Sequence, residues 1–327
     1  MAIVRSVETL ELRTLFAFAG ELDPAFAGDG IAFQPDGFLA DVTVQSDGKV
    51  LLFGAESGGA RDLVLRRLLA DGSPDTSFGP AGSGGVVRID LGGSEAAGEV
   101  LSLPDGKILL AASTSGPSSG QAAVIRLLGD GSFDPAFGTG GKVLLSPRTH
   151  SWLNDVAVQP DGKIVVAGGT WNGSMPVDTD ALLARLLPDG AIDTGFGTGG
   201  FVTAHAGNSD SLSGLAIDSR GYLISSAVTD VSFLQGDLVV FRFDASGSPD
   251  VGFGGGSGRV VVEDISDGAG DVLAVAHDGI VVSYHHTGGP QPGPVGHALL
   301  RLNDRGERVT DFGFDGVSVT DHYSRVN

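Results

Sequence analysis

Short apolar segments that alternate with polar residues recur along this chain, and glycine-rich turns separate them. In one stretch the alternating segment 155–159 is followed by a β-rich segment at 163–167, a third at 181–187 and a fourth at 201–204. Alternation with a period of two places successive side chains on opposite faces of a strand. Segments joined by short turns that end in glycine pair as antiparallel hairpins, because glycine accepts the positive φ of the turn. The pattern therefore predicts a four-stranded antiparallel meander.

The same meander recurs through the chain. Its hairpin signal reads Gln-Ser-Asp-Gly-Lys at 45–49, and the hairpin glycines stand 56 to 59 residues apart, at Gly48, Gly106, Gly162, Gly221 and Gly279. A Phe-Gly pair that follows an acidic turn repeats in phase, beginning at Phe78, Phe137, Phe196, Phe253 and Phe312. Two independent signals that share one period indicate tandem structural repeats.

A single four-stranded sheet cannot bury both of its faces, whereas like sheets packed radially bury them against each other. A parallel β-helix is the structural alternative, but its repeats are much shorter than this period. We therefore predict an all-β fold, a β-propeller of four-stranded antiparallel blades with five complete blades plus an incomplete sixth, in a single domain over 1–327. The predicted boundaries are 1–39 for the partial blade and 40–92, 93–148, 149–206, 207–264 and 265–327 for blades 1 to 5.

The ends of the chain leave two arrangements open. Residues 1–5, 8–15 and 31–33 match the second, third and fourth strands of a further blade that lacks its first strand. Residues 324–327 resemble 151–154, which stand just before the first strand of the third copy. The chain is then either a fragment of a longer array or a six-bladed ring closed by a three-stranded blade.

Composition and charge exclude several classes of partner. The formal charge is −20, from 40 acidic against 20 basic residues, and there is no cysteine. Nucleic acid and anionic membranes are excluded, because phosphate binding needs clustered Lys and Arg. No apolar run approaches the ~18 residues of a membrane span, and no signal peptide is recognised. An acidic surface keeps a glycine-rich protein soluble and attracts cations such as calcium.

The repeat also resembles a known family. Residues 155–168 read Asp-Val-Ala-Val-Gln-Pro-Asp-Gly-Lys-Ile-Val-Val-Ala-Gly, and Ala-Arg-Leu-Leu-Pro-Asp-Gly at 184–190 and Asp-Thr-Gly-Phe-Gly at 193–197 follow. These segments look like the bacterial delta-60 repeat, and the resemblance covers nearly the whole chain. It implies propeller arrays, often within large secreted or surface proteins, with no established activity and no functional residues to transfer. The fourth and fifth copies lose the Pro-Asp-Gly-Lys segment at 218–222 and 277–280.

Residues that recur in every copy are expected to serve the fold. An arginine stands five residues before the second turn glycine of each copy, at Arg67, Arg126, Arg185, Arg242 and Arg301. We predict that it forms a charge-assisted hydrogen bond to a turn carboxylate or a carbonyl; the turn carboxylates are Asp75, Asp134, Asp193 and Asp250. Phe78 and its equivalents are predicted to wedge between neighbouring blades.

One recurrent acidic position could hold a metal. Asp41, Glu99, Asp155 and Asp271 begin the innermost strand of their copies, with Gly214 as the exception. A carboxylate ring at the mouth of a central channel could bind calcium, which takes six to eight oxygen ligands. The alternative is that each acid accepts a hydrogen bond from the unpaired edge amides of its own strand.

Residues that do not recur are the better indications of binding, because the fold alone does not require them. They gather on the loops opposite the Asp-Gly hairpins, where a rigid scaffold commonly carries binding residues and exposed tryptophan suits sugars or protein partners. The predicted ligand-binding residues are Trp152, Trp171, His150, Asn154, Asn172, His205, His285 and His286. The two tryptophans could instead pack together as a loop plug.

The sequence contains no Gly-x-Ser-x-Gly, His-Glu-x-x-His or P-loop motif. The leading prediction is therefore a non-enzymatic propeller scaffold that binds a protein or a glycan through the variable loop face, within a larger secreted or surface assembly. The alternative is a metal-dependent hydrolase or lactonase with a cation held by the four ring acids. Calcium is the one cofactor considered.

Overall fold

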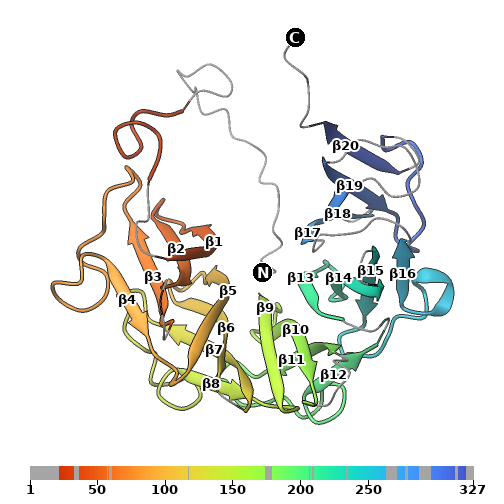
Figure 1. Cartoon of the computed structure of the whole chain (residues 1–327), viewed down its shortest axis with the longest axis horizontal. Helices are drawn as coiled ribbons and strands as arrows, with labels where there is room; N and C mark the ends of the chain where they lie inside the picture. Colours follow the sequence, from red (N-terminus) through yellow and green to blue (C-terminus); the bar gives the residue numbers. More distant parts are fainter. Residues whose placement is uncertain are drawn as a thin grey trace. The chain divides into compact units, whose positions relative to one another are not determined.

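The computed structural model describes residues 22–32, 37–56, 58, 61–116, 118–173, 179–205, 207, 210–232, 235–262, 271–276, 279–286, 296–313 and 316–321. These residues fall into two compact units, one within 7–156 and the other within 157–327. In each unit the secondary structure is strands and turns, apart from one short 3-10 turn at Gly254–Gly256 (Figure 1). The prediction of an all-β chain is confirmed.

Two sheets lie within residues 7–156. Each is a meander in which every strand pairs antiparallel with the next along the chain. The first sheet contains β1 (Phe38–Val44), β2 (Val50–Ala55), β3 (Leu63–Leu68) and β4 (Val86–Ile89), and the second contains β5 (Ser94–Ser102), β6 (Ile108–Ser115), β7 (Gly120–Leu127) and β8 (Lys142–Leu145).

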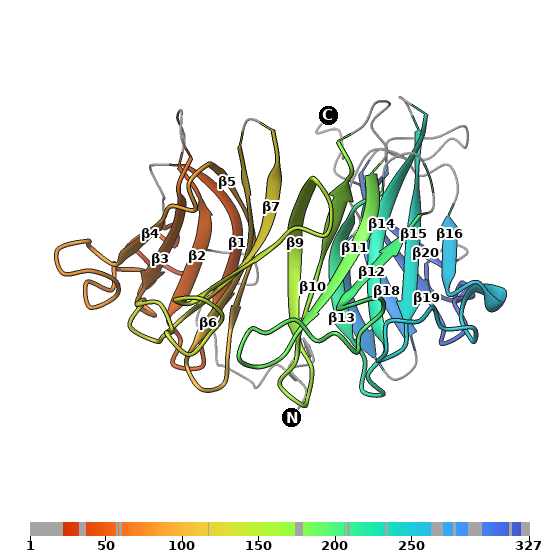
Figure 2. The ribbon, with the colours of Figure 1, turned by 90° about the horizontal axis from the view of Figure 1, so that it is seen from below.

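Three further sheets have the same order, with the first strand of the third lying at the boundary of the two units. Figure 2 shows the strands of the fourth sheet side by side. The strands are β9 (His150–Val158), β10 (Ile164–Trp171), β11 (Thr179–Leu186) and β12 (Phe201–Ala204); β13 (Leu212–Ile217), β14 (Leu223–Ser232), β15 (Gln235–Phe243) and β16 (Arg259–Val262); and β17 (Asp271–Ala276), β18 (Gly279–His286), β19 (Gly296–Leu302) and β20 (Val317–Asp321).

The Asp-Gly turns form the hairpins that the sequence predicts. In the first sheet the Gln45 N–H donates to the Lys49 carbonyl oxygen at 2.8 Å, and the Asp47 carboxylate accepts the Lys49 N–H at 3.2 Å. Gly48 completes the turn at φ +84°, a conformation that side chains disfavour. The strands predicted at 163–167, 181–187 and 201–204 are confirmed as β10, β11 and β12, whereas β9 begins five residues before the predicted 155.

Consecutive sheets pack on each other within each unit. In the 7–156 unit β1 contacts β5, and in the other unit β13 contacts β17. Backbone hydrogen bonds join the Phe-Gly turn of one sheet to the turn after the third strand of the next, from the Gly79 N–H to the Asp130 carbonyl at 2.8 Å and from the Gly197 N–H to the Ser246 carbonyl at 2.9 Å. The predicted packing of like sheets is confirmed in each unit. The terminal segments predicted as a sixth blade lie almost wholly outside the described residues.

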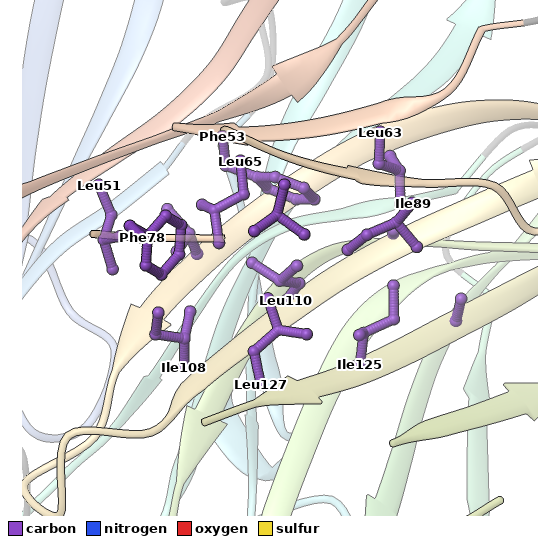
Figure 3. Close-up of a cluster of buried hydrophobic side chains, with 14 residues drawn as sticks. Leu51, Phe53, Leu63, Leu65, Phe78, Ile89, Ile108, Leu110, Ile125 and Leu127 are labelled. Atoms are coloured by element: carbon purple, nitrogen blue, oxygen red, sulfur yellow. The ribbon is translucent and has the colours of Figure 1, made fainter. Parts of the chain in front are cut away.

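The core of the 7–156 unit lies between its two sheets. Leu51 and Phe53 of β2 and Leu65 of β3 face Ile108 and Leu110 of β6 across the interface (Figure 3), and all five are fully buried. Burial of each such side chain stabilises the fold by about 1.5–3 kcal/mol. The sheets are therefore joined mainly by apolar contact, which fixes the positions of the strand ends where polar groups meet.

Candidate functional site

The recurrent arginines form the ion pairs that the sequence predicts. Each donates from Nε to a turn carboxylate eight residues later, at N···O distances of 2.9, 2.8, 2.8 and 2.6 Å for Arg67–Asp75, Arg126–Asp134, Arg185–Asp193 and Arg242–Asp250. In the first three copies the lysine of the Asp-Gly-Lys turn lies 3.4–3.6 Å from the same carboxylate. The arginine prediction is confirmed for these four copies.

The same guanidinium groups also link neighbouring sheets. Arg67 Nη1 donates to the Gly129 carbonyl at 2.5 Å in the next sheet, and Arg185 Nη1 reaches the Ala245 carbonyl in the same way. Each guanidinium lies over the Phe ring of its own copy, 4.3 Å from the ring centre in the case of Phe78. The hairpin side of the sheets is therefore a structural face, where recurring residues hold one repeat against the next.

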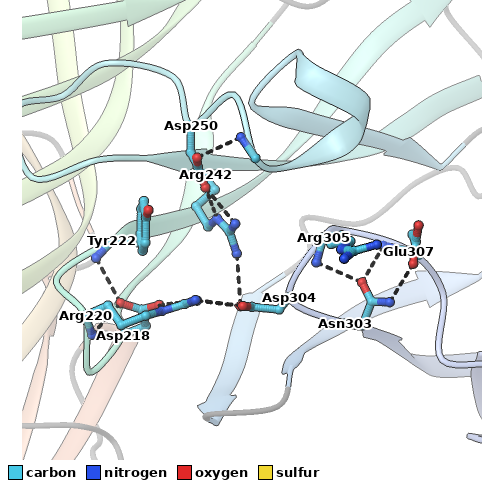
Figure 4. Close-up of polar contacts among 10 residues, drawn as sticks. Asp218, Arg220, Tyr222, Arg242, Asp250, Asn303, Asp304, Arg305 and Glu307 are labelled. Carbon is cyan, nitrogen blue, oxygen red and sulfur yellow. Dashed lines mark hydrogen bonds and ion pairs between the residues drawn. The ribbon is translucent and has the colours of Figure 1, made fainter.

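The divergent fourth copy keeps the Arg242–Asp250 pair but makes different side-chain contacts to the next sheet. Tyr222 stands in the place of the lysine, and Arg220 stands in the place of the hairpin aspartate. Arg220 pairs with Asp218 at 2.9 Å in its own turn and with Asp304 at 2.6 Å in the next sheet (Figure 4). Arg242 also reaches Asp304, at 3.3 Å. The fourth copy lacks the usual turn aspartate and lysine, but the contacts of Arg220 and Arg242 with Asp304 keep it joined to the fifth sheet.

The lowered pKa of Asp75 predicts that part of the free energy of unfolding is lost in acid. Hydrogen bonding by Ser77, together with the charge of Arg67, lowers the pKa of Asp75 from 3.8 to about 2, although burial acts in the opposite direction. An acid with a lowered folded-state pKa stabilises fully above its unfolded pKa, and this contribution is lost as the pH falls towards the folded value. We expect the difference in unfolding free energy between wild type and Asp75→Asn to be constant above about pH 5 and to shrink between about pH 4 and 2. Chemical denaturation at several pH values measures it, and a difference that is independent of pH would contradict the assignment.

The predicted ring acids lie in the first strands of their sheets, as expected. Asp41 in β1 accepts the Val100 N–H of the next sheet at 3.0 Å, and Glu99 in β5 accepts the Val156 N–H at 3.2 Å. Asp155 accepts the N–H of its own neighbour Val156 at 2.6 Å. The proposed bond to an amide of the same strand thus holds for Asp155, whereas the other two acids bond to the next sheet.

The register of the first strands explains these bonds. The pairing of β5 with β6 shifts between Ala97 and Val100, and similar shifts occur in β1, β13 and β17. A bulge leaves one residue unpaired in the ladder, and a carboxylate from the preceding sheet can satisfy an amide there. Asp271 is the first residue of β17, and its side chain lies outside the described part of the structure. A metal-binding role for these four acids stays a prediction.

The predicted loop-face residues are spread over several strand ends. His150, Trp152 and Asn154 belong to β9 and are half-buried. Trp171 ends β10 and is half-buried, while Asn172 is exposed. His205 follows β12 and is exposed, and His285 and His286 end β18 with side chains outside the described set. Their role in ligand binding stays a prediction.

A different group of acids, which the sequence analysis did not select, meets where the first sheet joins the second. Asp62 immediately precedes β3, Asp90 follows β4, and Glu95 is the second residue of β5. One carboxylate oxygen from each of the three lies within 4.8 Å of the others. The Glu95 N–H donates to the Arg61 carbonyl at 2.9 Å, which aligns the start of β5 with the start of β3. The two sheets thus bring three negative charges together.

Glu95 is the buried member of this acidic group. The residue is 2% exposed, and its Oε1 accepts the Gly93 N–H at 3.0 Å and the Thr114 hydroxyl at 2.9 Å. Its Oε2 has no hydrogen-bond partner among the residues that the structure describes. A Cβ at position 93 would lie 2.5 Å from Thr114 Oγ1, so only glycine allows this close approach. The site is therefore built around one buried oxygen that remains available.

No positive side chain in the described part of the chain pairs with these three carboxylates. The nearest arginine in the sequence to Asp90, Arg88, pairs instead with Glu56 at 2.5 Å. An ionised carboxylate that is buried without a partner costs several kcal/mol, because it loses its hydration. Like charges this close also repel each other. The arrangement is one that a bound cation would neutralise, since carboxylate oxygens are the ligands of hard divalent metals.

Comparison with known proteins gives structural similarities at low identity. A GH43 endo-arabinanase from Bacillus licheniformis matches with 11% identity and a TM-score of 0.42, covering 84% of this chain and 98% of that one. An α-L-arabinofuranosidase from Clostridium thermocellum matches with 12% identity and a TM-score of 0.39, covering 84% and 92%. A third match, described as a glycoside hydrolase, has 13% identity and a TM-score of 0.37, and covers 83% of this chain and 61% of that one. No relative was found among curated protein sequences.

These matches correct two predictions. The chain was expected to be a non-enzymatic scaffold and therefore not an enzyme, whereas all three matched structures are glycoside hydrolases, so both predictions are withdrawn. The expectation relied on missing sequence motifs, and it is weak because catalytic groups on such folds come from separate loops that no short motif connects. At TM-scores below 0.5 the similarity assigns neither a substrate nor catalytic residues to this chain. Among the described residues, no helix is long and apolar enough to cross a membrane.

A model of a protein family, described as a β-propeller domain of unknown function (DUF5122), matches residues 45–78, 103–137 and 159–196. Each matched stretch begins at an Asp-Gly hairpin and ends at the phenylalanine of a Phe-Gly turn. It therefore contains the arginine, the turn carboxylate and the phenylalanine that join one sheet to the next. The narrower delta-60 name stays a prediction. Three stretches of the chain are thus similar to the repeat of a β-propeller family.

Proposed function

We propose that this β-propeller repeat protein binds a divalent cation, with calcium preferred, through Asp62, Asp90 and Glu95. The buried Glu95 oxygen that has no partner among the described residues is the observation that carries the proposal. A cation at this point would neutralise three carboxylates and supply the missing partner.

Calcium fits the chemistry of these ligands best. All three side chains offer hard oxygen atoms and none offers nitrogen or sulfur, which disfavours zinc and copper. Calcium accepts six to eight oxygen ligands in flexible geometry, so waters and carbonyl groups can complete the shell around three carboxylates. Magnesium requires a near-ideal octahedron and gives up its water reluctantly. The formal charge of −20 raises the local concentration of cations near the surface.

The position of the ligands gives the cation a structural role. Asp62 and Asp90 flank strands of the first sheet, whereas Glu95 belongs to the second. A cation held by all three would join the two sheets at the end opposite the recurrent arginines. Binding to the folded state alone would stabilise the 7–156 unit by about 2.7 kcal/mol when the ligand is present at 100 times its Kd.

We also propose that the five sheets are the complete blades of one propeller and that residues 1–39 contribute an incomplete sixth. The equivalent hydrogen bonds from the first sheet to the second and from the third sheet to the fourth support this, because the same turn and the same arginine make them in each unit.

Calorimetric titration of the full chain with calcium chloride tests the cation site. We expect wild type to bind with a Kd of about 10⁻⁴–10⁻³ M, and Asp62→Asn to lose one equivalent of calcium. Asp105→Asn is the matched control, because it removes the same charge from an exposed hairpin that contacts Lys107 at 3.2 Å. Equal binding by wild type and Asp62→Asn, or no binding by wild type, would overturn the proposal.

A further inference from the structure

Different side chains occupy equivalent points of three copies. The first junction lies between the first and second sheets, the second lies within 7–156 where the second sheet meets the start of β9, and the third lies between the third and fourth sheets. Asp62 and Asp180 each stand five residues before a recurrent arginine, and Asp90 and His205 each directly follow the fourth strand of a sheet. The Asp210 N–H donates to the Thr179 carbonyl at 2.9 Å, just as the Glu95 N–H donates to Arg61. Asp180, His205 and Asp210 at the third junction are therefore the counterparts of the proposed calcium ligands.

At the third junction a histidine replaces one of the acids. His205 Nδ1 lies 3.0 Å from Asp180 Oδ1 and 3.7 Å from Asp210 Oδ2. Asp210 is fully buried and also accepts the Gly207 N–H at 3.1 Å. The Arg259 guanidinium donates to the His205 carbonyl at 2.9 Å and holds that residue in place. The imidazole thus provides, from within the chain, a nitrogen beside both carboxylates.

At the second junction the corresponding residues are all neutral. Gln121, Ser146 and Ser151 occupy the three positions, and Gln121 Nε2 donates to Ser146 Oγ at 2.8 Å. No carboxylate is present at these positions, so no charge needs a counter-ion. At the second junction an amide and hydroxyls occupy the three positions, and at the third junction an imidazole stands beside two acids. Among the described residues, the first junction differs from the other two in gathering three carboxylates with no imidazole beside them.

We infer that the residue after the fourth strand decides whether a junction takes a hard cation, and that His205 occupies the cation's place at the third junction. The inference rests on the proposed function, since it uses the first junction as the calcium-bound case. Asp90 adds a third oxygen ligand and a third charge at the first junction. His205 instead supplies a nitrogen, which is a poor calcium ligand and already lies within hydrogen-bond reach of Asp180.

Exchange of this residue between the junctions tests the inference, with calorimetric titration of the full chain by calcium chloride and thermal unfolding to check the fold. His205→Asp is expected to gain one equivalent of calcium relative to wild type, and Asp90→His to lose one. The double variant His205→Asp with Asp62→Asn should return to the wild-type number, because it gains one site and loses the other. Thr198→Asp is the control, since it adds a carboxylate at an exposed turn of the same unit away from the junction.

The outcomes separate the inference from the proposal on which it rests. If wild type binds and Asp62→Asn loses one equivalent, but His205→Asp gains none, the inference is wrong and the calcium site stands. A gain that Thr198→Asp reproduces would reflect added charge alone and would also overturn the inference. Unchanged binding by Asp90→His would overturn it as well. If wild type binds no calcium, the proposed function fails and the inference fails with it.

Discussion

Replacing Phe78 with alanine is expected to lower the free energy of unfolding of the 7–156 unit by about 3–5 kcal/mol. Phe78 is fully buried at the end of the first repeat, and the Arg67 guanidinium lies 4.3 Å from its ring centre. The next sheet closes over the ring, since a Cβ on Gly131 would lie 2.9 Å from Phe78 Cε2. Truncation therefore removes apolar burial, leaves a cavity between two sheets and takes away the surface on which Arg67 rests.

Unfolding in guanidinium chloride measures this loss, with the slope of the transition monitored to confirm that the same unit unfolds. Phe133→Ala is the control, because that ring is 36% exposed and contacts Lys142 at the surface. We expect the control to lose much less stability than Phe78→Ala. Equal losses in the two variants would show that Phe78 does not fill the space between the sheets.

The repeat architecture could be predicted from the sequence because its signals act locally. Gly48 and its equivalents are needed at one point of a hairpin whose geometry is set by five residues, so the sequence shows both the turn and its period. The Arg67–Asp75 pair spans only eight residues and repeats in phase. A residue that recurs in every copy is expected to stabilise the fold that every copy shares. The turn glycines and the Arg–Asp pairs could therefore be identified as structural from the sequence.

The partners of the inner-strand acids could not be predicted in the same way. Asp41 bonds to Val100 and Glu99 to Val156, in each case across to the next sheet. Both bonds depend on a shift of register in the first strand, such as that between Ala97 and Val100. A bulge of this kind leaves the apolar alternation almost unchanged, so the sequence suggested amides of the same strand instead.

The acidic group at the first junction was missed because it is assembled from three strand ends of two sheets. Asp62, Asp90 and Glu95 form no motif along the chain, and the second copy carries neutral residues at the equivalent points. A comparison of the residue five places before each recurrent arginine would have drawn attention to it, because Asp62, Asp180 and Asp237 share that position. What the sequence could not show is that Glu95 is buried with one oxygen that has no hydrogen-bond partner in the described part of the chain, since that follows from the packing of β5 on the first sheet.

Replacing Arg67 with alanine is expected to destabilise the 7–156 unit by about 3–5 kcal/mol, because it breaks a buried ion pair from one side. Arg67 is 6% exposed and Asp75 is 4% exposed, so Asp75 would keep its charge in the interior with Lys49, at 3.4 Å, as its remaining described cationic partner. The Gly129 carbonyl of the second sheet would also lose its guanidinium donor. Arg88→Ala is the matched control, since it breaks an exposed pair with Glu56 and should cost no more than about 1 kcal/mol.

The double variant Arg67→Met with Asp75→Asn shows whether the loss comes from the stranded charge. If it does, the double variant recovers part of the stability that Arg67→Ala loses, because no buried carboxylate remains unpaired. If the bond to Gly129 in the next sheet dominates instead, the double variant stays as unstable as the single one. A loss no larger than that of Arg88→Ala would show that neither contact holds the first two sheets together, and that apolar packing between them suffices.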